Sequence, residues 1–434
     1  MSNDKPQGVY ASYFASIVGE ENAVCLWEKI ELGQQKRIQQ AIASGNPPSC
    51  IVYPRSQQQL AAVIATAHSN NWRVLPCGNS SKLNWGGLVK GIDVVVSTER
   101  LNQLIEHAVG DLTVTVEAGM KFSDLQALLA KSRQFLALDP AAPESATIGG
   151  IVATGDTGSL RQRYGSVRDQ LLGITFVRAD GQVAKAGGRV VKNVAGYDLM
   201  KLFSGSYGTL GFISQLTFRV YPLAEASGTV VLTGTAEAVS QAADILRGSA
   251  LTPVQADLLS TKLVSSLGLG EGLGLIARFQ SISESVKEQS NRVLEVGQKL
   301  GLDGAIYVDG DEASLWQRLQ ERIHYAATES VITCKIGVLP TAAVEILTQV
   351  ELGLIHIGSG LGLLQLESKN QVLKVRDRTQ AHRGFLTILE APVAVKEQID
   401  VWGYTGNALS LMRRIKEQFD SKNILSPGRF VGGI

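Results

Sequence analysis

Residues 76–87 read Pro-Cys-Gly-Asn-Ser-Ser-Lys-Leu-Asn-Trp-Gly-Gly and follow directly on a short predicted strand at residues 73–76. Residues 78–81 offer successive backbone N–H groups together with small polar side chains, and such a run can surround a diphosphate as an anion-binding nest. Lys82 adds a positive charge. A surface turn is equally typical of this composition, so the loop alone leaves both interpretations open.

The residues around this loop predict two units of strand and helix. Residues 50–53 predict a strand that ends at Pro54, and Ser56 with Gln59 fits a capping box at the start of a helix. Apolar residues then recur at helical spacing, and residues 94–96 predict a further strand. A second unit follows from about residue 112, where apolar and polar residues alternate as in a half-buried strand.

Two further glycine-rich loops follow. The first runs from Pro143 to Gly150 and continues through small polar residues to Ser159 and then to Asp169. The second comprises residues 187–199 and 205–213, in which three glycines at a spacing of three precede a strand. Glycines of this kind let backbone lie against a flat ligand. The alternatives are stacked tight turns for the first loop, and a helix end followed by a strand start for the second.

Composition limits the remaining possibilities. The chain has 434 residues, of which 44% are hydrophobic and 19% charged, a balance typical of a soluble protein with a sizeable core. The 41 basic and 40 acidic residues argue against nucleic-acid binding. The four cysteines form no C-x-x-C pair, so we predict no metal site and expect free thiols in a reducing compartment. Without a secretory pattern or a run of ~18 apolar residues, we expect a cytoplasmic protein without a transmembrane segment, or one peripheral to a membrane through partners.

Several nucleotide and hydrolase motifs are absent from the sequence. No G-x-G-x-x-G follows a strand, and neither a P-loop nor an H-E-x-x-H nor a G-x-S-x-G sequence occurs. After about residue 225 strand and helix patterns alternate at larger spacing, which predicts a separate α+β cap on one sheet.

The order of five short motifs resembles that of a known family. They are Gly-Asn-Ser-Ser-Lys-Leu at 78–83, Ala-Thr-Ile-Gly-Gly at 146–150, Arg-Tyr-Gly-x-x-Arg-Asp at 163–169, Lys-Asn-Val-Ala-Gly-Tyr-Asp-Leu at 192–199 and Gly-Ser-x-Gly-Thr-Leu-Gly at 205–211. In this order they resemble the FAD domain of the p-cresol methylhydroxylase (PCMH) and vanillyl-alcohol oxidase flavoproteins. Residues 81–86 and 427–433 resemble in particular the GlcE branch, whose members are glycolate oxidase subunits.

The resemblance implies an α+β fold with a PCMH-type FAD-binding domain of two α+β subdomains. We expect a helical extension at 1–45, the FAD-binding domain at 46–225, a ferredoxin-like α+β cap at 226–405, and a C-terminal helix and tail at 406–434 that return to the FAD domain. FAD would be held without a covalent bond, because the first loop lacks the histidine that attaches it in some relatives, and Cys77 reads as a packing residue.

The resemblance also implies the residues that contact FAD. Those expected are Cys77, Gly78, Asn79, Ser80, Ser81 and Lys82 in the first loop; Ala146, Thr147, Ile148, Gly149, Gly150, Thr154, Gly155, Ser159, Tyr164, Gly165 and Val167 in the second; and Gly211 and Ile213 in the third.

Catalytic residues are less clearly indicated. Related hydroxy-acid dehydrogenases carry His-x-Gly-Asp-Gly-Asn-x-His in the cap, and residues 356–363 read His-Ile-Gly-Ser-Gly-Leu-Gly-Leu. His356 is the best candidate for a base, although a core histidine after an apolar run is the commoner case. Two further groups are candidates, each with a structural role as the alternative. Lys192, Tyr197 and Lys201 would position flavin or substrate, and Lys335 and Arg378 would bind a carboxylate.

The resemblance suggests three functions. The first is an FAD-binding oxidoreductase subunit of a glycolate (2-hydroxy acid) dehydrogenase complex, which accepts hydride on flavin and passes electrons to partners. Those partners would be a second flavoprotein subunit and an iron–sulfur subunit, since this chain has no iron–sulfur ligand set. The second is a self-sufficient FAD-dependent oxidoreductase of a 2-hydroxy acid or alcohol. The third is a non-catalytic scaffold with a flavin domain.

Overall fold

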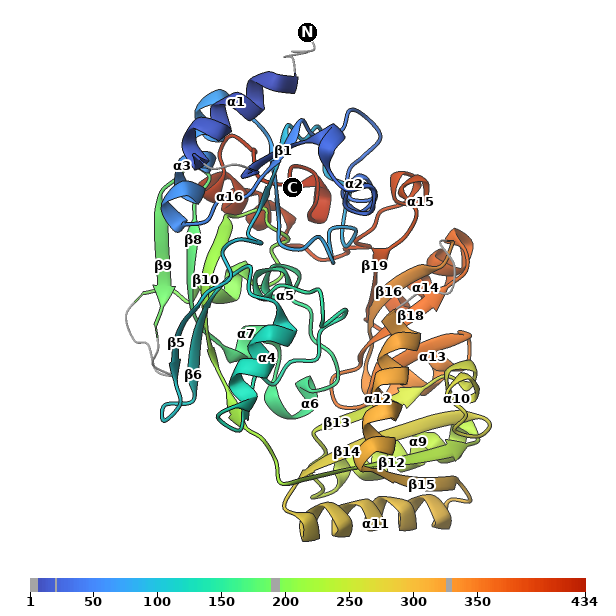
Figure 1. The fold of residues 1–434 in the computed structure, drawn as a ribbon. Helices are drawn as coiled ribbons and strands as arrows, with labels where there is room; N and C mark the ends of the chain where they lie inside the picture. The colour runs from blue at the N-terminus through green and yellow to red at the C-terminus, as the bar shows by residue number, and fades with distance from the viewer. Residues whose placement is uncertain (1–6, 20–21, 189–195, 325–329) are drawn as a thin grey trace.

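A computed structural model describes residues 7–19, 22–188, 196–324 and 330–434. Figure 1 shows two parts, one built from the N-terminal half and the C-terminal segment, and one from the middle of the chain. None of the helices in the described ranges combines the length and the apolar composition that a membrane crossing requires.

The first sheet contains the strand that leads into the first loop. Its order is β1 (Val24–Leu26), β2 (Cys50–Val52), β4 (Val94–Ser97) and β3 (Val74–Cys77), with β2, β4 and β3 parallel. Helix α3 (Gln57–Asn70) connects β2 to β3. It begins because the Ser56 side chain accepts a hydrogen bond from the Gln59 amide, and it ends at Asn71, which adopts the left-handed conformation. This βαβ unit fixes where loop 77–83 leaves the sheet.

The second sheet is antiparallel. Its order is β5 (Leu104–Ala108), β6 (Thr113–Glu117), β10 (Phe212–Arg219), β8 (Leu171–Val177) and β9 (Val183–Gly187). Helices α4 (Phe122–Ala130), α5 (Ile148–Thr154) and α8 (Leu199–Phe203) contribute buried residues to the same apolar cluster as this sheet. The short helix α5 therefore has a fixed position, with its first residues beside loop 77–83.

The cap contains one antiparallel sheet of eight strands within the described residues. Its order is β15 (Asp303–Val308), β12 (Ala226–Gly234), β14 (Leu273–Ser281), β13 (Gln255–Leu259), β17 (Leu352–His356), β18 (Leu361–Leu366), β16 (Ile332–Gly337) and β19 (Phe385–Glu390). Each half has the strand order 4-1-3-2 of a ferredoxin-like βαββαβ unit, and the first half has one additional helix, α10 (Thr261–Ser266), between its second and third strands. The predicted α+β class is confirmed, and the ferredoxin-like cap consists of two such units, joined where β13 pairs with β17.

Helices cover both faces of the cap sheet. On one face lie α9 (Ala236–Gly248), α11 (Ser283–Lys299), α13 (Ala343–Leu347) and α14 (Lys369–Ala381). On the other face lie α10 (Thr261–Ser266) and α12 (Asp309–His324), the helix that links the two units (Figure 1). The buried residues of α12 include Leu315, Trp316, Leu319 and Ile323, which recur at helical spacing.

The C-terminal segment rejoins the first sheet. After α16 (Leu409–Phe419) the Val74 amide donates to the Ile424 carbonyl, and the Ser426 amide donates to the Val74 carbonyl. The Lys416 side chain fixes this connection, since its buried Nζ donates to Asp420 Oδ2 at 2.6 Å and to the Thr209 carbonyl at 2.8 Å. The tail thereby extends past the end of loop 77–83.

Candidate active site

Loop 77–83, the start of α5 and residues 207–213 surround one hollow, here called the cradle. It is lined by Pro76 to Leu83, Thr98, Ala118, Thr147, Gly149, Gly150, Ala153, Thr154, Tyr207, Gly208, Gly211, Phe212, Ile213 and Arg429. Gly78 packs so closely on Thr147 that a Cβ atom there would lie 2.1 Å from Thr147 Oγ1. Ser80 adopts a left-handed conformation, with φ of 60°. The loop can therefore turn its backbone toward the hollow.

The polar groups of the cradle suit an anion. Within the described chain, the backbone N–H groups of residues 78–82 donate no hydrogen bond to a protein atom. The Arg429 guanidinium is buried, and its Nη2 donates to the carbonyls of Leu83 and Trp85 at 2.7 and 3.0 Å. Its Nη1 has no hydrogen-bond partner among the residues that the structure describes. Free N–H groups and a buried cation fit the diphosphate of a dinucleotide.

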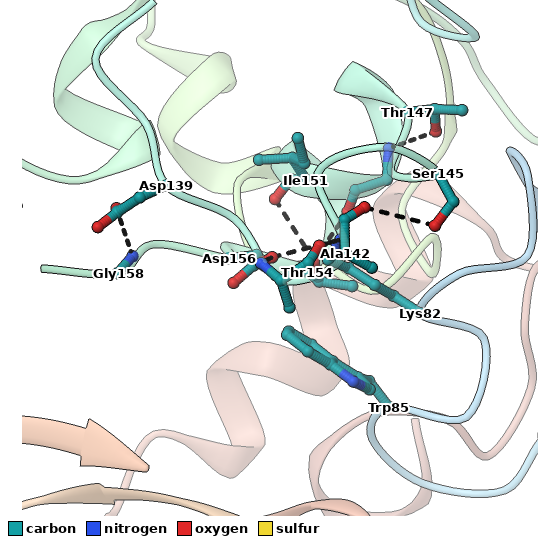
Figure 2. Close-up of polar contacts among 12 residues, drawn as sticks. Lys82, Trp85, Asp139, Ala142, Ser145, Thr147, Ile151, Thr154, Asp156 and Gly158 are labelled. Atoms are coloured by element: carbon teal, nitrogen blue, oxygen red, sulfur yellow. Dashed lines mark hydrogen bonds and ion pairs between the residues drawn. The ribbon is translucent and has the colours of Figure 1, made fainter. Parts of the chain in front are cut away.

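Lys82 contacts Asp156 and Ala141, whereas its place in the loop suggested a contact with the diphosphate. Its buried Nζ donates to the Ala141 carbonyl at 2.8 Å and lies 3.3 Å from Asp156 Oδ2. It also lies 5.6 Å from the centre of the Trp85 ring. Figure 2 shows Lys82 pointing toward Asp156, with Trp85 nearby. The charge closest to a bound diphosphate would therefore be that of Arg429, with Lys82 paired to Asp156.

The structure gathers most of the residues expected to contact FAD. Those lining the cradle are Cys77, Gly78, Asn79, Ser80, Ser81, Lys82, Thr147, Gly149, Gly150, Thr154, Gly211 and Ile213. Ser159 lines the neighbouring cavity instead. Those that line neither are Ala146, Ile148, Gly155, Tyr164, Gly165 and Val167. Among these last residues, the Tyr164 ring packs against Phe135 and Tyr221.

Sequence reasoning missed two prominent cradle residues. Tyr207 lies inside the glycine motif 205–211 and is buried, and it packs edge-on against Trp402 at 5.0 Å between ring centres. Arg429 lies in the tail motif at 426–429. Both motifs stand out in the sequence, but only the structure shows that these side chains turn into the cradle. Burial raises the pKa of the Cys77 thiol to about 12, so it is neutral.

A second hollow, here called the cavity, adjoins the cradle at Thr154 and Tyr207 and lies between the two parts of the chain. The first part contributes Trp85, Asp139, Thr154, Asp156, Thr157, Gly158, Ser159 and Tyr207. The cap contributes Gln255, Asp257, Trp316, Leu319, Gln320, Ile323, His324, Lys335, Leu354, His356, Leu361, Gly362, Leu363 and Leu389. A ring system bound at the inner end of the cradle would face this cavity.

His356 and Asp257 form a hydrogen-bonded pair in the cavity. They are register partners on β17 and β13, and His356 Nδ1 lies 2.5 Å from Asp257 Oδ1. The Ser159 hydroxyl donates to the same carboxylate oxygen at 2.7 Å. Burial would lower the pKa of His356, but the charge of Asp257 and its hydrogen bond outweigh burial and raise it. When Nδ1 donates to Asp257, Nε2 is the nitrogen that can accept a proton.

Asp139 brings a second carboxyl group close to His356. It accepts hydrogen bonds from the Gly158 amide at 3.0 Å and the Leu160 amide at 2.9 Å, and from Gln255 Nε2 of the cap at 3.2 Å. Burial raises the pKa of Asp139 to about 7, although the Leu160 amide and His356 oppose the rise. Figure 2 shows Asp139 bonded to Gly158. Asp139 therefore links the two parts of the chain and titrates near neutrality.

Lys335 supplies a cation to the cavity from β16. Burial lowers the pKa of Lys335, and the negative charge of Asp156 opposes the shift. Within the described ranges its Nζ makes no ion pair with a protein carboxylate, so it is available to an anionic ligand. His324, at the end of α12, also lines the cavity, and burial lowers its pKa.

The other predicted catalytic residues lie elsewhere. Lys192 falls outside the described residues. Tyr197 is 87% exposed and lines neither hollow. Lys201 pairs with Asp198 at 2.8 Å, with both side chains partly exposed. Arg378 lies on a surface groove beside Lys374 and not in the cavity. Of the basic catalytic candidates that fall among the described residues, His356 and Lys335 are the two that line the cavity.

Comparison with known proteins agrees with this arrangement. The family model described as "FAD binding domain" matches residues 48–187, which include loop 77–83, α5 and β8.

Two curated relatives and one solved structure illustrate the similarity. The mitochondrial D-lactate dehydrogenase [cytochrome] of Arabidopsis thaliana is 27% identical over 64% of this chain, which spans 50% of that relative's length. Glycolate oxidase subunit GlcD of Bacillus subtilis is 23% identical, over 88% of each chain. The structure of p-cresol methylhydroxylase has the same fold, with a TM-score of 0.75 at 16% identity over 97% of this chain and 96% of that one. Residues 48–187 therefore match an FAD-binding domain, and the chain as a whole has the fold of a PCMH-type flavoprotein.

Proposed function

We propose that this chain oxidises a small 2-hydroxy acid, with non-covalently held FAD as the hydride acceptor. The Arabidopsis relative is named a D-lactate dehydrogenase and the Bacillus relative a glycolate oxidase subunit. These names suggest the substrate class, and the polar groups of the cavity support it. A 2-hydroxy acid needs a cation for its carboxylate and a base for its hydroxyl proton, and the cavity offers Lys335 and His356 for these two roles.

The cradle supports the cofactor assignment. Residues 78–82 would hold the diphosphate through their free N–H groups, and the Arg429 guanidinium would neutralise part of its charge. Bound FAD supplies the acceptor for the hydride that leaves the hydroxyl-bearing carbon. Non-covalent binding agrees with the neutral, buried state of Cys77, the cysteine that borders the loop.

The protein's own contribution is to position and deprotonate the substrate. Lys335 Nζ would bind the carboxylate. His356 Nε2 would take the hydroxyl proton, so that the C–H bond can break as the carbonyl forms. Asp257 holds the imidazole in one orientation and stabilises its protonated form, and Ser159 orients Asp257.

One observation carries the proposal: the His356–Asp257 pair lies in the cavity that adjoins the cradle. A histidine with only a packing role in the core would be surrounded by apolar groups. The His356 ring is instead hydrogen-bonded to the fully buried carboxylate of Asp257, with the carboxyl group of Asp139 close by. Ser359, Leu361 and Leu363 replace the other polar residues of the family's segment. The replacements leave the base in place.

The fate of the electrons gives the proposal its second part. Since the sequence has no iron–sulfur ligand set, we propose that the electrons taken from the substrate would leave to a partner, either a second flavoprotein subunit or an iron–sulfur subunit of a glycolate oxidase complex. The similarity to a glycolate oxidase subunit favours this over a self-sufficient enzyme. A scaffold without activity would not need the buried pair in the cavity.

A single preparation tests these points. The full chain is purified and loaded with FAD, and its visible absorbance is recorded before and after anaerobic addition of glycolate or D-lactate. Bleaching of the flavin bands would support oxidation by this chain, and failure with every 2-hydroxy acid would contradict it. Acid precipitation should release the flavin into the supernatant if it is not covalently bound. Rapid reoxidation by oxygen alone would favour the self-sufficient enzyme.

A further inference from the structure

One side of the cavity is apolar. On α12, Trp316, Leu319 and Ile323 line it at positions i, i+3 and i+7, and therefore lie on one helix face. Trp316 is fixed in place, because its Nε1 donates to Thr229 Oγ1 at 2.9 Å. These side chains belong to the same apolar cluster as Leu354 of the sheet. The wall is therefore a rigid extension of the core.

The cap sheet adds leucines between the two groups assigned to substrate binding. Leu363 of β18 is the register partner of both Lys335 on β16 and Leu354 on β17. His356 lies two residues beyond Leu354, on the same face of its strand. Lys335 and His356 thus stand two strands apart, roughly 10 Å across the sheet, with Leu363 between them. A substrate that reaches both groups must lie over Leu363.

The charges of the cavity disfavour a second carboxylate on the substrate. Asp139, Asp156 and Asp257 all line it, and the Lys82 charge is already paired with Asp156. The remaining basic groups are His356, which is paired with Asp257, and His324, whose pKa burial lowers. Lys335 is therefore the one cation of the described cavity that is free to bind an anion.

We infer that the substrate is a 2-hydroxy monocarboxylate with an apolar side chain, which rests against Leu319, Ile323 and Leu363. This inference rests on the proposed function and narrows it. Glycolate, which has no side chain, would bind less tightly than its longer homologues, and dicarboxylic 2-hydroxy acids would be excluded.

A matched substrate series tests this specificity. The FAD-loaded full chain is mixed anaerobically with glycolate, lactate, 2-hydroxybutyrate and 2-hydroxypentanoate, and with malate and 2-hydroxyglutarate, each chiral acid as both enantiomers. The rate of flavin bleaching is measured at several concentrations of each acid, and its dependence on concentration gives an apparent Kd. Each added CH2 group should lower that Kd about fourfold until the wall is filled, the factor that corresponds to ~0.8 kcal/mol. The two dicarboxylates should reduce the flavin at least tenfold less efficiently than monocarboxylates of equal length.

A pair of glutamine substitutions on α12 checks the location. Gln320→Arg adds a cation to the cavity wall. It should raise the efficiency of flavin reduction by the dicarboxylates at least tenfold relative to that by the monocarboxylates. Gln317→Arg makes the same change on the exposed side of the helix and should change nothing. Two results would overturn the inference and leave the proposed function standing. One is that dicarboxylates reduce the flavin of the unaltered chain as efficiently as monocarboxylates. The other is that longer monocarboxylates bind more weakly than glycolate. If no 2-hydroxy acid bleached the flavin, both the inference and the proposed function would fall.

Discussion

Asp257 and His356 face each other across the join between the two ferredoxin-like units of the cap, with 2.5 Å between Oδ1 and Nδ1. Each unit contributes one member of the pair, and Ser159 of the other part of the chain donates to the same carboxylate. Asp257 is fully buried, and its Oδ2 has no partner among the described residues. The base proposed for catalysis therefore depends on the contact between three structural units.

Replacing Asp257 by Asn should impair the base while leaving its position filled. If the NH2 group of the new asparagine donates a hydrogen bond to Nδ1, the ring proton must sit on Nε2. A base needs a lone pair at that nitrogen. We expect the rate of anaerobic flavin reduction to fall ~10²-fold, within the range that a general base contributes. Stopped-flow absorbance at saturating substrate measures this rate.

Ser159→Ala is the matched variant for Asp257→Asn, since it removes the donor to the carboxylate and keeps the carboxylate itself. A decrease of only a few-fold is expected. If Asp257→Asn reduced flavin as fast as the unaltered chain, Asp257 would have a purely structural role.

The dependence on pH follows from the direction of the His356 shift. Burial lowers the pKa of His356, while Asp257 and Asp139 raise it and Arg161 lowers it, with a net rise above 6.5. A base must be unprotonated, so flavin reduction should increase as pH rises through this raised pKa. The Asp257→Asn substitution removes the group that raises the pKa of His356 most. The acidic limb of the pH–rate profile should therefore move to lower pH. A limb that stayed in place would show that another group titrates, with Asp139 the first candidate.

Lys335→Met should affect substrate binding more than the chemical step. Removal of one partner of a buried charged pair costs about 2–5 kcal/mol, so the apparent Kd for the hydroxy acid should rise at least ~30-fold. The matched control is Arg378→Met, since Arg378 was an equal candidate from the sequence but lies on a surface groove. Equal effects of the two substitutions would contradict the assignment of Lys335.

Much of the first part of the fold could be predicted from the sequence, because its signals are local. The capping residues Ser56 and Gln59 and the strand before Pro76 fall where the structure has α3 and β3. The loops could be recognised because small residues at fixed spacing are needed where backbone packs closely, as at Gly78.

The cavity was harder to predict because long-range pairing forms it. Asp257 lies on β13, whose sequence Gln-Ala-Asp-Leu-Leu shows no clear alternation of buried and exposed residues, since every residue is buried. Its partner His356 is distant in the chain, so only the sheet register brings the two together. Helix α12 did carry a periodic signal in Leu315, Leu319 and Ile323, but its position over the sheet depends on tertiary packing.

Gly78→Ala should abolish FAD binding without unfolding the chain. The added Cβ would lie 2.1 Å from Thr147 Oγ1, so the loop or the start of α5 must shift. We expect the purified variant to be colourless and to fail to take up added FAD. Gly110→Ala is the control, because no atom lies within 4 Å of its added Cβ. The double variant Gly78→Ala/Thr147→Ala should regain part of the binding, whereas full retention of FAD by the single variant would show that this contact does not shape the cradle.

Lys416→Met should destabilise the chain through the C-terminal tail. Lys416 Nζ donates to Asp420 Oδ2 at 2.6 Å and to the carbonyls of Thr209 and Leu425 at 2.8 and 2.9 Å. Removing this cation leaves a buried carboxylate without its charged partner, and such losses cost about 3–5 kcal/mol. Urea unfolding followed by tryptophan fluorescence should show a lower midpoint. Because Thr209 lies between Gly208 and Gly211 of the cradle, FAD should also dissociate more readily.

Arg414→Met provides the matched control, since Arg414 lies on the exposed side of the same helix, where substitutions usually change stability by less than ~0.5 kcal/mol. The double variant Lys416→Met/Asp420→Asn should recover part of the loss, because the unpaired buried charge is then removed as well. An unfolding midpoint for Lys416→Met equal to that of Arg414→Met would mean that the buried pair does not hold the tail. The position of Arg429 in the cradle would then have to depend on its own hydrogen bonds to the carbonyls of Leu83 and Trp85.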